Sequence, residues 1–138
     1  MYWLIAEDEA DIRNLVAMMC TVWGHTPMTF ESGQKAWDWI DTVVDGTNTQ
    51  PLPEFALMDI RMPGYRGDEV ARRLRDTEPL ARMPIVLMTA FVLSDEERKE
   101  MMKNSGVDEI INKPLPEFNA LRNMLHEIIE RKKNEALP

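Results

Sequence analysis

Asp59 is the residue whose position in this chain most clearly suggests chemistry. It ends the apolar run 55–58, which is typical of a short buried strand, and Pro63 and Gly64 then turn the chain. In open α/β sheets, ligands and reacting groups lie at the carboxyl ends of the strands, which is where this carboxylate would stand. Capping of the following turn by the Asp side chain is the purely structural alternative.

Three other apolar runs also end in side chains that can do chemistry. The run 2–6 is followed by Glu7 and Asp8, the run 85–88 by Thr89, and the run 107–111, after one residue, by Lys113. Because the strands of a parallel sheet point the same way, these side chains and Asp59 are expected to converge on one crevice.

Charge in such a crevice must be balanced. Two carboxylates ~4 Å apart repel by about 4 kcal/mol at an effective dielectric constant of ~20. Lys113 supplies one positive charge, and Mg²⁺, which prefers carboxylate, water and phosphate oxygens, fits as the source of the rest. No cluster of His and Cys suggests zinc, and His25 and His126 are isolated in the sequence, so both are expected at surface or helix positions without chemistry. A carboxylate beside a metal, an amine and a hydroxyl predicts phosphoryl transfer through an aspartyl phosphate.

The segments between these strands carry apolar residues at helical spacing, so strands and helices alternate five times. The run 26–30 is a weaker strand, expected at an edge because of Pro27. The inward faces of the first, second and last helices are predicted to be Ile12, Leu15, Val16, Met19 and Trp23; Ala36, Ile40, Val43 and Val44; and Phe118, Leu121, Leu125, Ile128 and Ile129. The fourth helix, opened by a capping box at Ser94, is highly charged. This order predicts an α/β fold with a doubly wound parallel sheet.

Composition excludes several classes of protein. The 138 residues suit one domain, and a net charge of -8 argues against sequence-independent binding of nucleic acid. No apolar run approaches the ~18 residues of a membrane span, and the first residues do not resemble a signal peptide. Cys20 is alone and is expected to be a small core side chain. A cytoplasmic location is expected from these facts together.

In this order and spacing, the motifs make the chain similar to the receiver domain of two-component response regulators. The matching residues are Glu7 and Asp8, the run from Asp59 to Pro63 with Gly67, Thr89 and Ala90, and Lys113 and Pro114. The resemblance implies a flavodoxin-like (βα)5 fold with strand order 2-1-3-4-5. It covers residues 1–133, which leaves 134–138 as a C-terminal tail.

The resemblance also implies a role for each residue. Asp59 would be the phosphoacceptor, Lys113 would pair with the phosphoryl oxygens, and Thr89 would hydrogen-bond one of them after phosphorylation. It further implies a cis Lys113–Pro114 bond.

The same resemblance implies a Mg²⁺ site. Asp8, Asp59 and the backbone carbonyl of Arg61 would be its ligands, and Glu7 would act through a metal-bound water.

Three departures from the family pattern are visible. The loop 47–53 and the segment between Thr89 and Gly106 are longer than usual. Position 110 is Ile, where the family usually has Tyr or Phe, so this chain lacks the aromatic side chain that usually reports the switch.

The function expected from these features is a phosphorylation-operated signalling switch rather than a turnover enzyme. A sensor histidine kinase or a phosphotransfer protein would donate the phosphoryl group, and the chain would assist only its own phosphorylation and dephosphorylation. Because no output domain follows, output by protein contact is expected on the face of the fourth and fifth helices and the fifth strand, where a dimer could also form. No direct contact with nucleic acid or membrane is expected.

Two rival functions remain. A pseudo-receiver would be an interaction module that is never phosphorylated. A phosphatase of the haloacid-dehalogenase type would want a second acid two residues after the nucleophile, and Arg61 stands there.

Overall fold

The computed structural model describes residues 1–135 and contains one parallel sheet with strand order β2-β1-β3-β4-β5. The strands are β1 (Tyr2–Ala6), β2 (Thr26–Phe30), β3 (Phe55–Asp59), β4 (Ile85–Thr89) and β5 (Glu109–Asn112). The helices are α1 (Ala10–Val22), α2 (Gly33–Val44), α3 (Gly67–Arg75), α4 (Asp95–Ser105) and α5 (Phe118–Glu135). The predicted fold and strand order are therefore confirmed.

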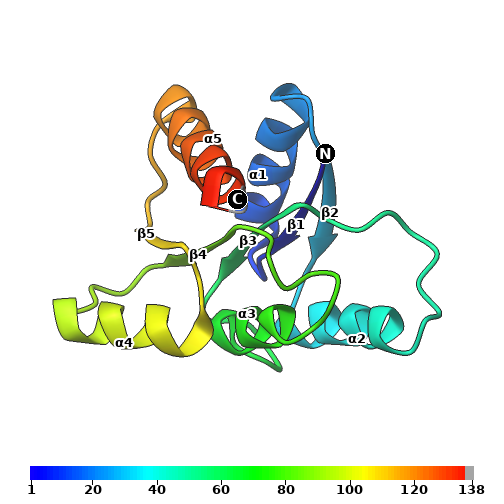
Figure 1. Cartoon of the computed structure of the whole chain (residues 1–138). Coiled ribbons are helices and arrows are strands. Elements are labelled where there is room, and N and C mark those ends of the chain that lie inside the picture. The colour runs from blue at the N-terminus through cyan, green and yellow to red at the C-terminus, as the bar shows by residue number, and fades with distance from the viewer. Residues whose placement is uncertain (136–138) are drawn as a thin grey trace.

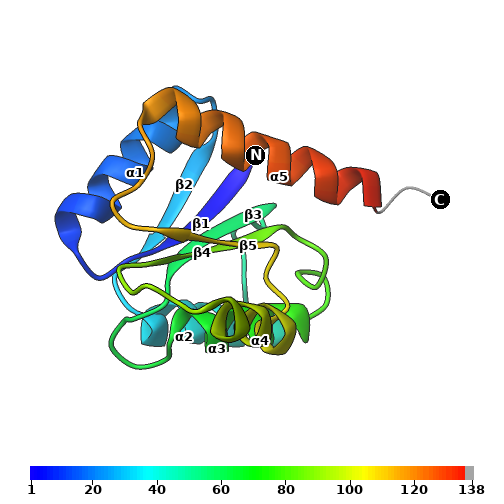
Figure 2. The same ribbon diagram turned by 90° about the vertical axis from the view of Figure 1, so that its left-hand side faces the viewer.

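Helices cover both faces of the sheet. Figures 1 and 2 show α1 and α5 on one face and α2, α3 and α4 on the other. This arrangement follows from the parallel pairing, because each strand must be joined to the next by a crossover that lies on a face of the sheet. None of the helices within residues 1–135 combines the length and the apolar character needed to cross a membrane.

Two cores result from the alternation of side chains along each strand. The face toward α2, α3 and α4 receives Leu4, Ala6, Ala56, Met58, Ile85, Leu87 and Ile110. The face toward α1 and α5 receives Trp3, Ile5, Phe55, Leu57, Val86, Met88 and Ile111. Because both faces of the central strands are buried, their sequences read as continuous apolar runs, and the first polar residue of each run marks the edge of the sheet.

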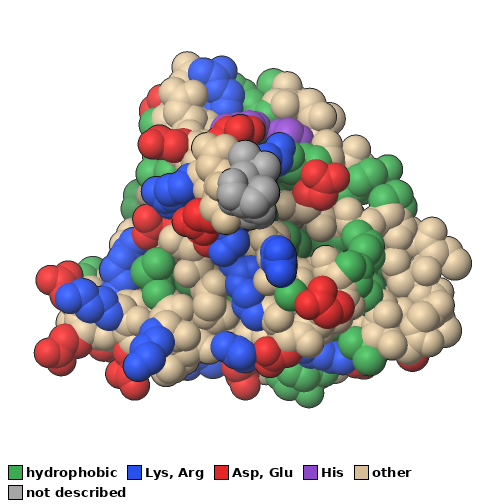
Figure 3. All heavy atoms as spheres, viewed as in Figure 1, with side chains coloured by type: hydrophobic (Ala, Val, Ile, Leu, Met, Phe, Trp, Pro, Cys, Tyr) green, Lys and Arg blue, Asp and Glu red, His purple; other side chains and the backbone are tan. Residues whose placement is uncertain are grey.

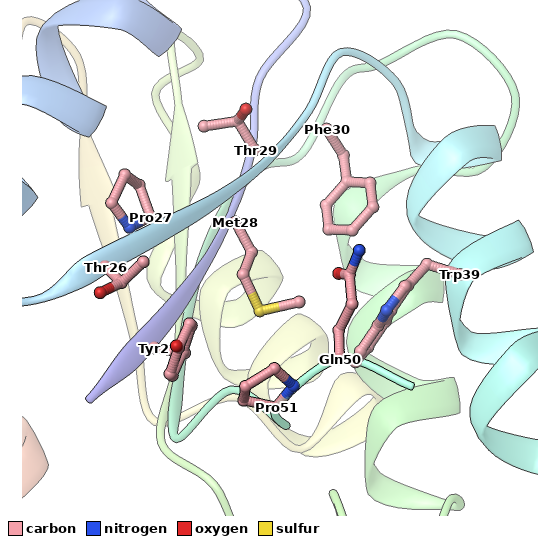
Figure 4. A pocket seen from close by; sticks show the side chains of 9 residues that line it. All are labelled: Tyr2, Thr26, Pro27, Met28, Thr29, Phe30, Trp39, Gln50 and Pro51. Atoms are coloured by element: carbon pink, nitrogen blue, oxygen red, sulfur yellow. The ribbon is translucent and has the colours of Figure 1, made fainter. Parts of the chain in front are cut away.

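The edge position predicted for β2 is confirmed, and the loop between α2 and β3 folds beside it. Gln50 and Pro51 of this loop, together with Trp39 and Met28, line a pocket of about 440 Å³ at that edge (Figure 4). Pro27 lacks an N–H, so it removes one donor that another strand would need in order to pair with this edge.

The fourth helix has the character expected from its sequence. The Ser94 hydroxyl accepts from the Glu97 N–H at 3.1 Å and the Glu97 carboxylate accepts from the Ser94 N–H at 3.1 Å, which forms the predicted capping box. Met101 and Met102 are only half-buried, and Ser105 is the one fully buried residue of the helix. Charged side chains of both signs cover its exposed surface (Figure 3).

Three predictions about inward faces are wrong. Leu15 is 48% exposed, Val44 is 61% exposed and Phe118, the first residue of α5, is 38% exposed. Periodicity indicates an apolar stripe but not the extent of the neighbouring element that covers it. Helix α5 continues to Glu135, beyond the boundary expected at residue 133, and residues 136–138 of the predicted tail lie outside the described residues.

Candidate functional site

The predicted crevice is formed at the carboxyl edge of the sheet. Asp59 is the last residue of β3 and Thr89 the last of β4, while Glu7 directly follows β1 and Lys113 directly follows β5. Backbone pairing fixes these positions, because the Ile60 N–H donates to the Met88 carbonyl and the Lys113 N–H donates to the Thr89 carbonyl. Residues from four separate segments therefore meet at one place, as the sequence predicts.

Lys113 connects the two buried acids of this crevice. Its Nζ atom lies 2.9 Å from Glu7 Oε2 and 3.0 Å from Asp59 Oδ2. The Glu7 side chain is fully buried and those of Lys113 and Asp59 are about one-tenth exposed, so the ion pairs are largely shielded from water. Such pairs are stronger than surface pairs, although burial of the charges offsets much of the gain.

Burial and mutual contact shift the ionisation of this group. Burial raises the pKa of Glu7, the hydrogen bond from Lys113 lowers it, and the nearby Asp59 charge raises it again, with a net upward shift. For Lys113, burial lowers the pKa, but the bonds to Glu7 and Asp59 outweigh burial and raise it overall. The site therefore keeps its lysine charged while its innermost carboxylate resists ionisation.

The donor set suits a hard divalent cation. Carboxylate oxygens of Glu7, Asp8 and Asp59 all lie within 4.8 Å of one another. These oxygens would hold one Mg²⁺ ion, directly or through a bound water. When all three carboxylates are ionised, they and the one ammonium leave two negative charges, which matches a divalent cation.

Arg13 fixes the turn that carries two of the acids. Its Nη1 atom donates to the Glu7 carbonyl at 2.9 Å and lies 3.4 Å from the Asp8 carbonyl. The Glu9 N–H donates to Glu7 Oε1 at 3.2 Å, which orients the buried carboxylate. The Asp8 side chain is exposed, so its direction depends on this backbone support. No sequence motif singles out Arg13, although it lies only four residues after Glu9.

Gly67 allows the third helix to begin directly against Asp59. A Cβ atom at this position would lie 2.2 Å from the Asp59 carbonyl oxygen, and the Gly67 N–H donates to the Ile60 carbonyl at 2.8 Å. Only glycine permits this approach. The loop between β3 and α3 is thereby held close to the carboxylate.

Phe91 joins three other residues at the crevice. Its N–H donates to Thr89 Oγ1 at 3.0 Å, and its carbonyl accepts from Asn112 Nδ2 at 2.9 Å. The guanidinium carbon of Arg61 lies 3.8 Å from the centre of the Phe91 ring, in a cation–π contact. The Arg61 side chain, two residues after Asp59, thus reaches across to the ring two residues after Thr89. The contact between Phe91 and Asn112 could not be predicted from the sequence, because the two residues are 21 positions apart.

The exposed side of α1 forms a groove that ends at Lys113. The groove has a volume of about 540 Å³, and its lining is Ile12, Leu15, Met18, Met19, Val22 and residues 113–118. Met18 and Val22 are 59% and 66% exposed. The apolar stripe of α1 is therefore divided between the core and a surface beside the crevice.

The structure places Glu7, Asp8, Asp59, Thr89 and Lys113 together, and the predicted cis Lys113–Pro114 bond is confirmed. His126 lies on α5, in agreement with the expected helix position, but no sequence pattern indicates that His25 and His126 are in contact. Their Nε2 atoms lie 2.8 Å apart at a different part of the molecule.

Comparison with protein families agrees with this geometry. Residues 3–126 match the model of the response regulator receiver domain. The chain belongs to this family. Receiver domains are signalling domains of two-component systems and are not classical enzymes.

Curated relatives include the phosphate regulon transcriptional regulatory protein PhoB of Pseudomonas aeruginosa, 33% identical over 111 residues. That match covers 80% of this chain but only 44% of PhoB, so the chain spans less than half the length of that relative. The polar-differentiation response regulator DivK of Brucella ovis is 36% identical over 112 residues, which cover 81% of this chain and 83% of DivK.

Solved structures share the fold at low sequence identity. A CheY-like receiver domain protein from Methanospirillum hungatei JF-1 has a TM-score of 0.79 at 20% identity and covers 98% of both chains. The receiver domain of the sensor histidine kinase PA1611 from Pseudomonas aeruginosa has a TM-score of 0.74 at 22% identity and covers 94% of this chain and 97% of its own. That structure has a magnesium ion coordinated in its active-site cleft.

The upward pKa shift of Glu7 predicts a stability effect in the receiver. Since the folded state disfavours the charged form, Glu7→Gln should raise the free energy of unfolding near pH 7 in Mg²⁺-free buffer by about 1 kcal/mol. The gain should shrink as the pH falls toward ~4.3, where the unfolded carboxyl is protonated and the wild type is no longer penalised. Urea unfolding between pH 4 and 8 measures this difference.

Glu9→Gln is the matched control, because Glu9 belongs to the same turn and its side chain is exposed. It should leave the unfolding free energy almost unchanged across the same range. A Glu7→Gln protein that is less stable than the wild type near pH 7 would contradict the burial argument.

Proposed function

We propose that this receiver domain, residues 1–133, accepts a phosphoryl group on Asp59 with the help of Mg²⁺. Asp8, Asp59 and the Arg61 carbonyl would hold the ion directly, and Glu7 through a water. The observation that carries the proposal is the contact of Lys113 Nζ with both Asp59 and Glu7. With Asp8, these residues form a group in which the carboxylates outnumber the single ammonium. Mg²⁺ would neutralise charge on the phosphoryl oxygens.

The residues of the chain suggest how transfer proceeds. One Asp59 oxygen forms a bond to phosphorus as the bond from phosphorus to the donor histidine nitrogen breaks. Asp59 then loses its formal charge, so Lys113 can turn from its carboxylate to a phosphoryl oxygen. The Thr89 hydroxyl accepts from the Phe91 N–H, which leaves its own proton free to bond another phosphoryl oxygen.

A sensor histidine kinase or a phosphotransfer protein would be the donor. The apolar groove on α1 supports a protein donor, because its lining runs up to Lys113 and would bring a docked partner next to Asp59. The face of α4, β5 and α5 is proposed for output contacts or a dimer. The domain would assist its own dephosphorylation but would not turn over free substrates.

Two rivals have less support. A pseudo-receiver is an interaction module that is never phosphorylated. Such a module would not need the five site residues, so their close grouping does not support it. A phosphatase of the haloacid-dehalogenase type needs an acid two residues after the nucleophile, whereas the Arg61 side chain there is engaged with the Phe91 ring.

Phosphorylation of Asp59 is directly testable. A small acyl phosphate with Mg²⁺ should add one phosphate to the intact protein, measured by mass spectrometry, and Asp59→Asn should abolish the addition. Omission of Mg²⁺ should slow labelling at least tenfold. Labelling that survives in Asp59→Asn would move the acceptor elsewhere, and a wild type that is never labelled would favour the pseudo-receiver.

The Arg61–Phe91 contact predicts a long-lived phosphoryl group. A guanidinium stacked on a ring beside Asp59 should hinder an attacking water, so we expect replacement of both by small polar residues to speed the loss of phosphate about tenfold. Phosphate release from the labelled protein measures the rate. Arg66→Ser is the matched control, because Arg66 is also exposed but its guanidinium pairs with Asp68, whereas that of Arg61 contacts the Phe91 ring. An unchanged rate in the double variant would refute the idea.

The light packing of α4 predicts where the signal travels. Thr89 is tied to the backbone of Phe91, so movement of its hydroxyl toward a phosphoryl oxygen should pull the segment that leads into α4. Ile110 is 2% exposed and has no ring to swing, so it should move little. Hydrogen exchange with a phosphoryl mimic should change across residues 90–103 and stay constant around Ile110. Unchanged protection across 90–103 while the mimic is bound would rule out this route.

A further inference from the structure

His25 and His126 meet at the opposite side of the sheet from the crevice. His25 immediately precedes β2, and His126 lies in the middle of α5. Their ring centres are 5.0 Å apart and their Nε2 atoms 2.8 Å apart, so the rings meet through their Nε2 edges rather than face to face. Figure 3 shows histidine atoms at the surface between α1 and α5. We call these two residues the histidine pair.

Hydrogen bonding determines where the protons of the histidine pair lie. His126 Nδ1 is 2.7 Å from the Arg122 carbonyl, which can only accept, so this nitrogen carries a proton. In the neutral ring, Nε2 of His126 is then an acceptor. His25 must therefore donate through its own Nε2. Its Nδ1 atom is left as a buried acceptor without a partner among the described residues.

If His25 were protonated at Nδ1, the new N–H group would need a hydrogen-bond acceptor, and the neighbouring rings do not supply one. The ring of Trp3, which is fully buried, lies flat on His25 with centres 4.5 Å apart and an angle of 18°. Trp23 contacts both Trp3 and His126 through its ring, at 5.9 Å in each case. Indole groups donate hydrogen bonds but do not accept them, so they cannot satisfy an additional N–H.

Charged groups near the histidine pair come from three elements. The Met1 amino group and Lys133 of α5 oppose a positive charge on His25, while Glu54, just before β3, favours one. Arg122 lies one turn before His126 and shares a pocket with it. Among the side chains and termini that act on the charge of His25, two cations oppose one acid, which adds to the cost of burying a charged imidazole.

We propose that the histidine pair is a proton-responsive contact that holds α5 against β1 and the start of β2. A first added proton must sit on the buried His25 Nδ1 without an acceptor. A second must sit on His126 Nε2, which would set two N–H groups against each other at 2.8 Å and break the contact. Protonation therefore favours a state in which α5 has moved away.

This state would also alter the surface beside the crevice. The Trp23 and Phe118 rings lie 5.3 Å apart, and Phe118 lines the apolar groove that ends at Lys113. Release of α5 would remove one wall of that groove. The inference itself rests on the histidine pair alone and stands whether or not Asp59 is phosphorylated.

The direction of the pH effect follows from burial. Burial lowers the pKa of His25, and the neighbouring His126 lowers it further. A histidine whose pKa is depressed by folding stabilises the protein above its unfolded pKa of ~6.5, and this stability is lost as the pH falls through the folded value. Acidification below ~6.5 should therefore open the contact.

The test compares the whole chain with His25→Gln/His126→Gln, which lacks both histidines of the sequence. Any pH dependence left in this variant between pH 5 and 8 comes from other groups. Below pH 6.5, the ratio of the unfolding equilibrium constant of the wild type to that of the variant should rise as the pH falls. We expect a rise of about tenfold per pH unit for each proton that the unfolded state binds and the folded state does not. Parallel curves would overturn the proposal, even if the variant is less stable throughout.

A second measurement does not depend on the stability of any variant. Nitrogen NMR of the wild type at pH 7.5 should show His126 protonated at Nδ1 and His25 at Nε2, and hydrogen exchange of α5 should accelerate below pH 6.5. The opposite tautomers, or protection of α5 that is unaffected by acid, would overturn the assignment.

Discussion

The placement of Lys113 between Glu7 and Asp59 is the interaction on which the carboxyl edge of this protein depends. The two acids follow β1 and end β3, which are neighbours in the sheet, so they would repel each other across a short gap if no cation lay between them. The ammonium comes from the end of β5, at the far edge. The charge balance therefore exists only when the strands are paired in their observed order, and the fold and the site are formed together.

The surrounding residues act on the backbone more than on the charges. Arg13 holds the carbonyls of the acidic turn, Gly67 lets α3 begin against the Asp59 carbonyl, and Asn112 holds the carbonyl of Phe91. Such contacts keep the carboxylates close without adding negative charge. The net upward pKa shift of Glu7 indicates that the hydrogen bond from Lys113 only partly offsets the burial of this carboxylate.

The sequence predicted the site well because one rule covers all of its parts. Lys113 and Glu7 are 106 residues apart, yet each follows an apolar run, and parallel strands bring such positions to one edge. His25 and His126 are 101 residues apart, and no comparable rule relates the start of an edge strand to one face of a distant helix. The exposure of Leu15 was missed for a related reason: periodicity identifies an apolar stripe but not how much of it a neighbouring helix covers.

The two ends of α4 are held very differently, which limits how this helix can move. At its carboxyl end, Arg75 donates to the Gly106 carbonyl at 2.8 Å and to the carbonyls of Ala81 and Met83, and it pairs with Asp108 at 2.9 Å. At its amino end, the capping box of Ser94 lies within the helix's own first turn and ties it to nothing else. Arg98 is paired with Glu109 of β5, one turn further along.

These contacts determine how α4 can move. Gly106, which has a positive φ of 76°, joins the helix to the contacts of Arg75, so a displacement that begins at Thr89 would tilt α4 about its carboxyl end. The largest movement would then fall on the turn nearest the carboxylates, where a small change in charge can act on it.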